Sequence, residues 1–330
     1  STDGTQARST QNGLTLSGTI AFGSSVQNGS LLLSGAVDLT AGAILTVDSP
    51  LTWTGSVQGA AGVTKQGAAE WKLAGTNSLT GAVQIAAGTL HVSGGAALAD
   101  SAVVALGTSA TLKLSSPEEI AALTGAGLVN VQSHTLSVSG AQSRTFDAVL
   151  WGTGGFEQKG SQANLTMNSA SPNFSGAVVM SAGTLTLGHQ QAFGVGGTNT
   201  VQFRGGTLGY AAGITTDLSA RIQPVASGVT AFIDISQGTD VVYMTGVAGD
   251  GGMTKIGLGT LTFGGANVFV GSLVISSGTI VLGTGGTSGS LLAQVYNEGN
   301  LAFNRSDNLT VPGVLTGIGS REQRGTGRVE

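Results

Sequence analysis

The sequence predicts a parallel β-solenoid, in which the chain winds into stacked coils of short strands. Three observations predict it: strand-like alternation of polar and apolar residues, abundant glycine and a long internal repeat. Glycine makes up 56 of the 330 residues, well above the usual ~7%. Charged residues are only 9%, so the helix formers Glu, Lys and Arg are scarce. The composition therefore favours many short strands and turns.

The same composition excludes several classes of protein. The net charge is −4, which lacks the basic footprint of a nucleic-acid partner. Cysteine is absent, which excludes disulfides, thiolate metal sites and a cysteine nucleophile. No apolar run approaches the ~18 residues of a membrane helix. The first residues do not resemble a signal peptide, and we interpret the chain as a mature fragment or an expressed piece of a longer protein.

A block of 17 residues recurs four times without gaps, and its last glycines are spaced by 93, 97 and 68 residues. The copies begin at Leu51, Arg144, Val241 and Leu309, and the fourth is truncated by the end of the chain. A sandwich has no reason to repeat in this way, and a propeller needs ~40–50-residue blades with tight hairpins. We therefore expect a single β-helix domain over residues 1–330.

A second block, which begins at Asn77, Pro172 and Asn267, supplies the strands with the clearest period of two. Such alternation indicates strands with one buried face. Leu90, Leu185 and Ile280 hold one repeat position and should point inward. The other residues predicted to face the core are Val92, Leu112, Leu114, Leu187, Leu261 and Phe263. Strands recur every 7 to 11 residues, which predicts roughly 14 or 15 coils of three strands.

One segment departs from this pattern. Ser116 precedes Pro117, and Glu119 follows three residues after Ser116, which is the signature of a helix N-terminus. The sequence therefore predicts one short helical excursion near residues 116–123, most simply as an insertion at a coil corner, with a partner-binding protrusion as the alternative.

The repeats resemble the passenger-associated repeat of bacterial autotransporters over roughly residues 30–330. Gly59 to Gly67 matches its Gly-x-Gly-Gly-Leu-x-Lys-x-Gly element, Thr260 to Gly271 its Leu-x-Leu-x-Gly-x-Asn element, and Ala87 to Leu90 its Ala-Gly-Thr-Leu element. The sequence departs from the family where Leu79, Phe174 and Phe269 replace the usual tyrosine.

The resemblance implies a right-handed, single-stranded parallel β-helix. It also implies export through the periplasm to the cell surface of a Gram-negative bacterium. The C-terminal membrane barrel of the family is expected to be absent from this stretch and to be a partner within the full-length protein. Members of the family are mostly adhesins, self-associating surface proteins or stalks for another domain.

Little in the sequence indicates catalysis, and we expect neither an enzyme nor a cofactor or metal site. His91, His134 and His189 lack metal-ligand spacing, and His91 should be a solvated surface residue. Glycan cleavage would need two carboxylates about 5.5 Å or 6.5–9.5 Å apart. The candidates are Asp217, Asp234, Asp240 and Asp250, of which Asp217 and Asp240 are 23 residues, or about one coil, apart.

The expected function is adhesion or self-association, with a host surface or identical molecules on neighbouring cells as partners. The alternatives are a passive stalk that presents an N-terminal effector domain, and a glycan-cleaving β-helix enzyme. Near the C-terminus, Arg321, Arg324 and Arg328 form either a basic patch for anionic glycan or part of a truncated repeat. We favour the truncated repeat, which predicts high mobility and weak hydrogen-exchange protection after Gly319.

Overall fold

The structure is a computed structural model that describes residues 6–24, 26, 29–196 and 199–330. It divides into two compact units, one of residues 1–163 and 171–176 and the other of residues 164–170 and 177–330. Each unit is built from parallel strands in a β-solenoid, which confirms the predicted fold class. The described residues form about 16 turns, slightly more than expected. The handedness and the single domain stay predictions.

The first unit is made entirely of short strands and turns among its described residues. Its strands are β1 (Arg8–Thr10), β2 (Leu14–Phe22), β3 (Leu31–Leu33), β4 (Val37–Val47), β5 (Leu51–Trp53), β6 (Val57–Gly59), β7 (Val63–Gln66), β8 (Glu70–Ala74), β9 (Ser78–Leu79), β10 (Val83–Ser93), β11 (Val103–Leu114), β12 (Glu118–Ile120), β13 (Ala122–Gly125), β14 (Leu128–Gln132), β15 (Leu136–Val138), β16 (Arg144–Phe146), β17 (Val149–Gly152) and β18 (Phe156–Gln158).

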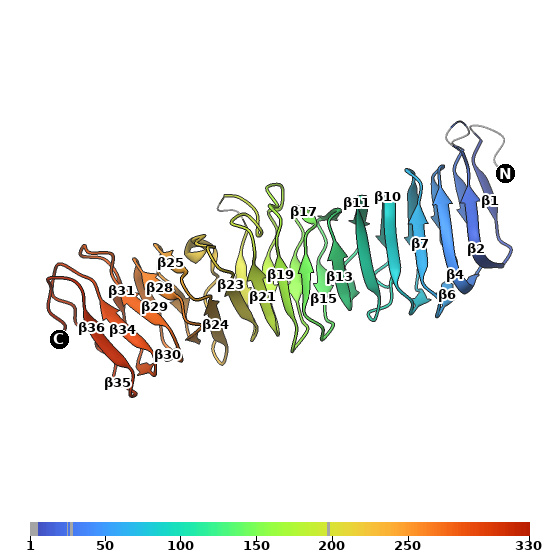
Figure 1. The fold of residues 1–330 in the computed structure, drawn as a ribbon. Helices are drawn as coiled ribbons and strands as arrows, with labels where there is room; N and C mark the ends of the chain where they lie inside the picture. Colours follow the sequence, from blue (N-terminus) through green and yellow to red (C-terminus); the bar gives the residue numbers. More distant parts are fainter. Residues whose placement is uncertain (1–5, 25, 27–28, 197–198) are drawn as a thin grey trace. The chain divides into compact units, whose positions relative to one another are not determined.

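Strands of the first unit pair in parallel with strands of the next coil, as the blue-to-green ribbons of Figure 1 show. Leu51 lies between Leu31 and Trp71, so one coil takes about 20 residues. The long strands β4, β10 and β11 run around a corner, and each pairs with two shorter strands. The register therefore stacks residues about 20 positions apart directly on one another.

The second unit also consists of strands, with one short 3₁₀ turn, η1 (Ser219–Arg221), among its described residues. Its strands are β19 (Asn164–Met167), β20 (Val178–Met180), β21 (Thr184–Leu187), β22 (Val201–Phe203), β23 (Thr207–Tyr210), β24 (Thr230–Ile235), β25 (Asp240–Tyr243), β26 (Ala248–Gly249), β27 (Gly252–Ile256), β28 (Thr260–Phe263), β29 (Ala266–Phe269), β30 (Leu273–Ile275), β31 (Thr279–Leu282), β32 (Ser290–Leu291), β33 (Val295–Asn297), β34 (Asn300–Phe303), β35 (Leu315–Thr316) and β36 (Ser320–Gln323).

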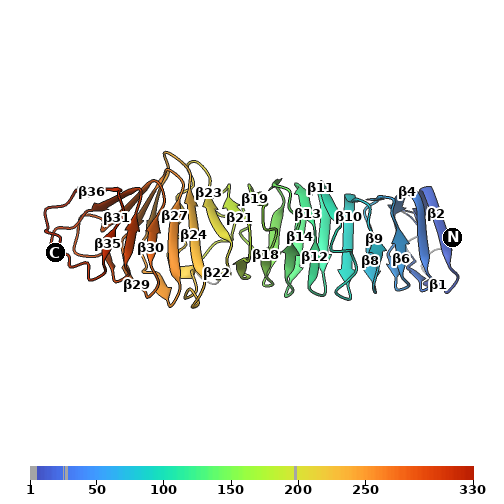
Figure 2. The ribbon, with the colours of Figure 1, turned by 90° about the horizontal axis from the view of Figure 1, so that it is seen from below.

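Three parallel sheets surround the core at the C-terminal end of the second unit. They run β24-β27-β30-β33-β35, β25-β28-β31-β34-β36 and β26-β29-β32, and Figure 2 shows their successive coils in orange and red. None of the helical segments in the described residues has the length and apolar character of a membrane span. Each coil at this end thus has three outward faces. Along each strand, side chains on the outward face alternate with side chains that point into the core.

The alternation of the sequence predicts the core correctly. Every residue predicted to point inward is fully buried, including Leu90, Leu185 and Ile280. Leu185 packs in register between Leu165 and Leu208. Aromatic rings reinforce the first unit, where the centroids of Trp53 and Trp71 lie 4.8 Å apart.

The predicted helix near residues 116–123 is wrong. Glu118–Ile120 and Ala122–Gly125 are strands β12 and β13, each paired in parallel with a neighbouring coil. The Glu118 carboxylate accepts a hydrogen bond from the backbone amide of Leu98 at 2.6 Å, across the stack. Ile120 and Leu123 are fully buried. The register of the solenoid therefore outweighs the local helix signal, and Ser116, the predicted helix cap, instead accepts a hydrogen bond from the backbone amide of Gly95 in an adjacent coil.

Candidate functional site

Two lysines, Lys65 and Lys255, point into the solenoid, although each carries a charge. They hold the same position in the first and third copies of the 17-residue block, and both are fully buried. Lys65 Nζ donates to the carbonyl oxygens of Gln66, Gly67 and Ala87 at 3.3, 2.9 and 2.9 Å. Lys255 Nζ likewise donates to three carbonyls, the third being that of Ser277 in the next coil. Each ammonium thus satisfies the carbonyls of one coil corner.

A glycine of the Ala-Gly-Thr-Leu element leaves room for each ammonium. A Cβ on Gly88 would lie 2.7 Å from Lys65 Nζ, and one on Gly278 would lie 2.9 Å from Lys255 Nζ. Both glycines also have φ near +70°, a conformation that costs glycine little. The lysine and glycine elements of the repeat therefore form one corner.

Glutamines occupy the equivalent position in the other two copies. Gln158 donates to the carbonyl of Gly160, and Gln323 donates to those of Gly325 and Gly327. A neutral amide therefore replaces the ammonium at this position, where it again supplies N–H groups to the carbonyls of the corner.

Burial lowers the pKa of Lys65 and of Lys255 to about 8, against a partial opposing effect of Asp48 and Asp234 respectively. The unfolded chain, with lysines near pKa 10.5, then binds more protons than the folded chain between about pH 8 and 10.5. Stability from these groups therefore rises with pH across that window.

We expect the urea midpoint of the wild type to rise between pH 8 and 9.5 relative to that of the double variant Lys65→Gln/Lys255→Gln, which lacks both ammonium groups. The measurement is urea unfolding at a series of pH values. Burial also raises the pKa values of Tyr210 and Tyr243. Because both proteins contain these tyrosines, their effect cancels in the comparison. Parallel midpoints across the range would contradict the depressed lysine pKa values.

Buried amides and hydroxyls bridge neighbouring coils at a second repeat position. The amide of Val57 donates to Asn77 Oδ1 at 2.7 Å, while Asn77 Nδ2 donates to the carbonyl of Ala97. Asn267 accepts the corresponding bond from the amide of Val247, and Ser171, one residue before the equivalent Pro172, accepts it from the amide of Leu150. These side chains satisfy backbone groups that no strand ladder reaches.

His91 is buried against its neighbours, so the prediction of a solvated surface histidine is wrong. Its Nδ1 lies 2.9 Å from Glu70 Oε1, and its Nε2 lies 2.5 Å from Ser115 Oγ. Lys113 Nζ lies 3.6 Å from Glu70 Oε2. Burial raises the pKa of Glu70, but the hydrogen bond and charge of His91, with Lys113, outweigh it and hold that pKa below its ordinary value.

This Glu70–His91–Ser115 row has the connectivity of a nucleophile, a base and a carboxylate. Catalysis would also need donors for an oxyanion. The amide of Ser115 already donates to the carbonyl of Val92, and that of Gly95 donates to Ser116 Oγ. These two amides are thus already engaged in the stack. The contacts of His91 with Glu70 and Ser115 link side chains of three successive coils on their outer face.

The four aspartates considered for glycan cleavage occupy different surroundings. Asp217 accepts hydrogen bonds from the backbone amides of Ser219 and Met244, so its carboxylate lies beside Met244 and is engaged in the turn. Asp234 lines a polar cleft of about 260 Å³ with threonine, serine and asparagine side chains. Asp240 and Asp250 are exposed. No group of three or more His, Asp or Glu in the described chain could hold a metal ion.

His134 and His189 lie on turns of different units, apart from His91 in sequence and environment. The amide of His134 donates to the carbonyl of Val131, and His189 Nδ1 accepts from the amide of Gln191. Both histidines therefore take part in local turns.

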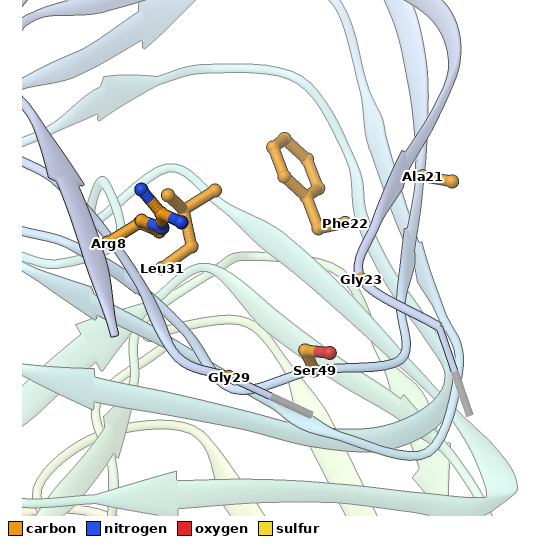
Figure 3. A pocket seen from close by; sticks show the side chains of 7 residues that line it. All are labelled: Arg8, Ala21, Phe22, Gly23, Gly29, Leu31 and Ser49. Atoms are coloured by element: carbon orange, nitrogen blue, oxygen red, sulfur yellow. The ribbon is translucent and has the colours of Figure 1, made fainter. Parts of the chain in front are cut away.

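A cavity of about 380 Å³ lies beside β1 and the end of β2. Figure 3 shows Arg8 and Leu31 side by side, facing Phe22 across the opening. Its lining comes from Arg8, Ala21–Gly23, Gly29, Leu31 and Ser49, and residues 25 and 27–28 lie outside the described residues.

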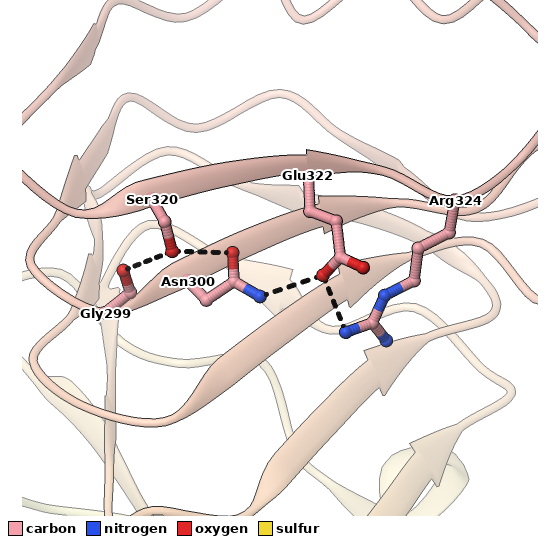
Figure 4. A network of polar contacts seen from close by, with 5 residues as sticks. All are labelled: Gly299, Asn300, Ser320, Glu322 and Arg324. Carbon is pink, nitrogen blue, oxygen red and sulfur yellow. Dashed lines mark hydrogen bonds and ion pairs between the residues drawn. The ribbon is translucent and has the colours of Figure 1, made fainter.

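Two of the C-terminal arginines, Arg321 and Arg324, have different surroundings. Arg321 lies in register with buried Leu301, whereas Arg324 bonds to Glu322 at 2.8 Å and lowers the pKa of that carboxyl. Figure 4 shows this pair continuing through Asn300 to Ser320. Ser320–Gln323 form a regular strand, β36, paired with β34. Weak hydrogen-exchange protection after Gly319 stays a prediction.

The most distinctive surface of the second unit is an apolar row of Val268, Val270 and Leu292. Their exposed fractions are 49%, 76% and 56%. Val268 and Val270 lie at the end of β29, and Leu292, just after β32, donates its amide to the carbonyl of Asn267 in the adjacent coil. The row is therefore contiguous over two coils of one outward face.

Comparison of the repeat copies shows that the fold does not need apolar residues in this row. The positions of Val268 and Val270 are Ser78 and Thr80 in the first copy, and Asn173 and Ser175 in the second. Strand periodicity and motif spacing do not reveal this surface. The signal in the sequence is the change from polar to apolar residues at outward positions of one repeat copy.

The chain is similar to a known repeat family in two stretches and to a known autotransporter over 258 residues. The family model of the passenger-associated-transport-repeat matches residues 63–92 and 253–282, the two stretches that contain the Lys65–Gly88 and Lys255–Gly278 corners. The adhesin BmaC autotransporter of Brucella suis biovar 1 (strain 1330) is 28% identical over 258 residues, which cover 74% of this chain. The chain spans only 7% of the length of that relative. No solved structure matches the chain.

Proposed function

Because the chain is a segment of an autotransporter passenger domain, built of passenger-associated repeats, we propose that it acts at the bacterial cell surface in adhesion or self-association. The observation that carries this proposal is the apolar row of Val268, Val270 and Leu292. Its valines replace polar residues that the other repeat copies place at the same outward positions.

An exposed apolar row on a soluble surface favours contact with another protein. Burial of apolar surface contributes about 25 cal/mol per Å², and contiguous exposed apolar groups commonly mark interaction sites. The rest of the solenoid surface is rich in Ser, Thr, Asn and Gly, which suits solubility. The chain accordingly serves as a binding surface, and neither a passive stalk nor an enzyme would use this row.

The test is the double variant Val268→Ser/Val270→Thr, which restores the residues of the first copy. We expect it to lose most of the binding of the chain to host cells or to a second copy, measured by cell-binding and sedimentation assays. Its stability should change by no more than about 0.5 kcal/mol, because both positions are on the surface. Loss in the first assay assigns adhesion, and loss in the second assigns self-association.

The control is Leu258→Ser, which removes another exposed apolar side chain of the same unit, outside the row. It should bind as the wild type does in both assays. Wild-type binding by the double variant would reject the row as the contact surface. Equal loss in the control would mean that general surface hydrophobicity is responsible.

A further inference from the structure

The first unit exposes a tryptophan, which is unusual for so large an apolar side chain. The chain has three tryptophans. Trp53 and Trp71 are fully buried in the core, whereas Trp151 on β17 is 49% exposed. Exposed tryptophan is enriched where ligands bind, because the ring offers a large apolar face with little loss of side-chain entropy.

The repeat shows that the fold does not require an aromatic side chain here. Trp151 holds the position of Gln58 in the first copy, Ala248 in the third and Thr316 in the fourth. These four positions are equivalent in sequence but do not stack on one face, since β26 and β35 belong to different sheets. In the stack that holds Trp151, the two preceding coils carry Asn130 and Lys113, neither of them aromatic. The indole is therefore an addition to the surface of the second copy alone.

Asparagines flank Trp151 on both neighbouring coils. Asn130 is its direct partner in the register of β14 and β17. On the other side, the bridge between Gly152 and Phe174 and the bond from the Gly152 amide to the carbonyl of Asn173 set Asn173 beside Trp151. Val129 and Phe174, the adjoining residues, are buried, so both asparagines share the outward face of the indole. Strands of adjacent coils lie ~4.8 Å apart.

The backbone beside the indole is held in a fixed and uncommon conformation. Gln132 has φ +49°, the one described residue other than glycine with positive φ. Asn130 Oδ1 accepts from its amide at 3.0 Å, and the amides of Thr153 and Gly154 donate to its carbonyl. These bonds fix both coils around Trp151, so the platform is preorganised.

We propose that Trp151, with Asn130 and Asn173, binds a neutral glycan. The apolar face of a pyranose ring stacks on an indole, and its hydroxyls need donors and acceptors on either side, which amide side chains supply together. Asn130, Gln132, Trp151, Thr153 and Asn173 are all uncharged, which favours a neutral sugar over an anionic one. The site is in the first unit and does not depend on the apolar row of the second.

The test measures binding of cellohexaose, maltohexaose and β-1,4-mannohexaose to the whole chain by calorimetry and tryptophan fluorescence. At least one should bind at millimolar concentration or below and change the emission of Trp151. Trp151→Gln, which installs the residue of the first copy, should weaken that binding at least about tenfold, and Asn173→Ala severalfold, with unchanged unfolding midpoints.

Gln58→Trp in a Trp151→Gln background is the matched control. It places an indole at the position that is equivalent in the sequence repeat but lies in another strand stack, where the register partners are Asp38 and Ser78 instead of asparagines. It should not restore binding. The variant Val268→Ser/Val270→Thr should bind the glycan normally, so the two proposals can fail separately.

The inference would be overturned if none of the three hexasaccharides bound at millimolar concentration, if Trp151→Gln bound as tightly as the wild type, or if Gln58→Trp restored binding by itself. Tighter binding of a heparin hexasaccharide than of every neutral probe would also overturn it, because it would show that charge governs recognition.

Discussion

Replacing Leu185 with alanine is expected to lower the free energy of unfolding by about 2–5 kcal/mol. Leu185 is fully buried, and its side chain packs in register between Leu165 and Leu208 of the two neighbouring coils. Those coils are held by strand ladders and cannot collapse into the cavity that the shorter side chain leaves. Urea unfolding followed by far-ultraviolet circular dichroism measures the loss.

Ile280→Ala should cost about as much as Leu185→Ala. From the sequence alone, the proximity of Ile280 to the truncated repeat predicts that this site relaxes more easily. The structure instead places Ile280 between Leu261 and Leu301, with full burial. Thr184→Ala, on the outward face beside Leu185, is the control and should change stability by less than about 1 kcal/mol. An unchanged midpoint for Leu185→Ala would refute its inward assignment.

Replacing Lys255 with methionine is expected to cost about 3 kcal/mol or more, whereas Lys255→Gln should cost less than half as much. Methionine fills the space but leaves the carbonyls of Ile256, Gly257 and Ser277 without the ammonium. A buried acceptor left unsatisfied costs roughly 1–3 kcal/mol. Glutamine retains an N–H donor, as Gln158 shows at the same repeat position. Urea unfolding at pH 7 compares the two.

The control for this pair is Lys72→Met, a lysine on the outward phase of β8 between buried Trp71 and Leu73. It should leave the midpoint almost unchanged. If Lys255→Met matched the wild type, the corner carbonyls would have to find other partners, and the ammonium would not be a structural group.

The period of two predicts the core because burial in a solenoid follows strand phase. Val63 and Lys65 lie on the same side of their strand, so the alternation alone already places Lys65 inside. The carbonyl groups that accept hydrogen bonds from its buried charge can be identified only from the stacked coils. Ser116 shows the opposite failure, since its local helix-cap signal could not reveal a hydrogen-bond partner 21 residues away.

The surface is predicted less well, for a related physical reason. Outward residues need only tolerate solvent, so neither period nor turn chemistry determines them. Trp151 and Val268 stand out only when the repeat copies are aligned with one another in sequence. His91 was misassigned because outward phase does not mean exposure when Glu70 and Ser115 of adjacent coils cover the ring.

The buried side-chain bonds between coils have short reach along the chain. Asn77 serves an amide 20 residues before it and a carbonyl 20 residues after it, and Lys65 reaches 22 residues ahead. Contacts of such constant, short separation give stability as a sum over nearest neighbours. Closing each new coil then costs about the same loop entropy as the last. Folding can therefore advance as a zipper, in which every coil completes the polar pairing of the one before it as the chain emerges.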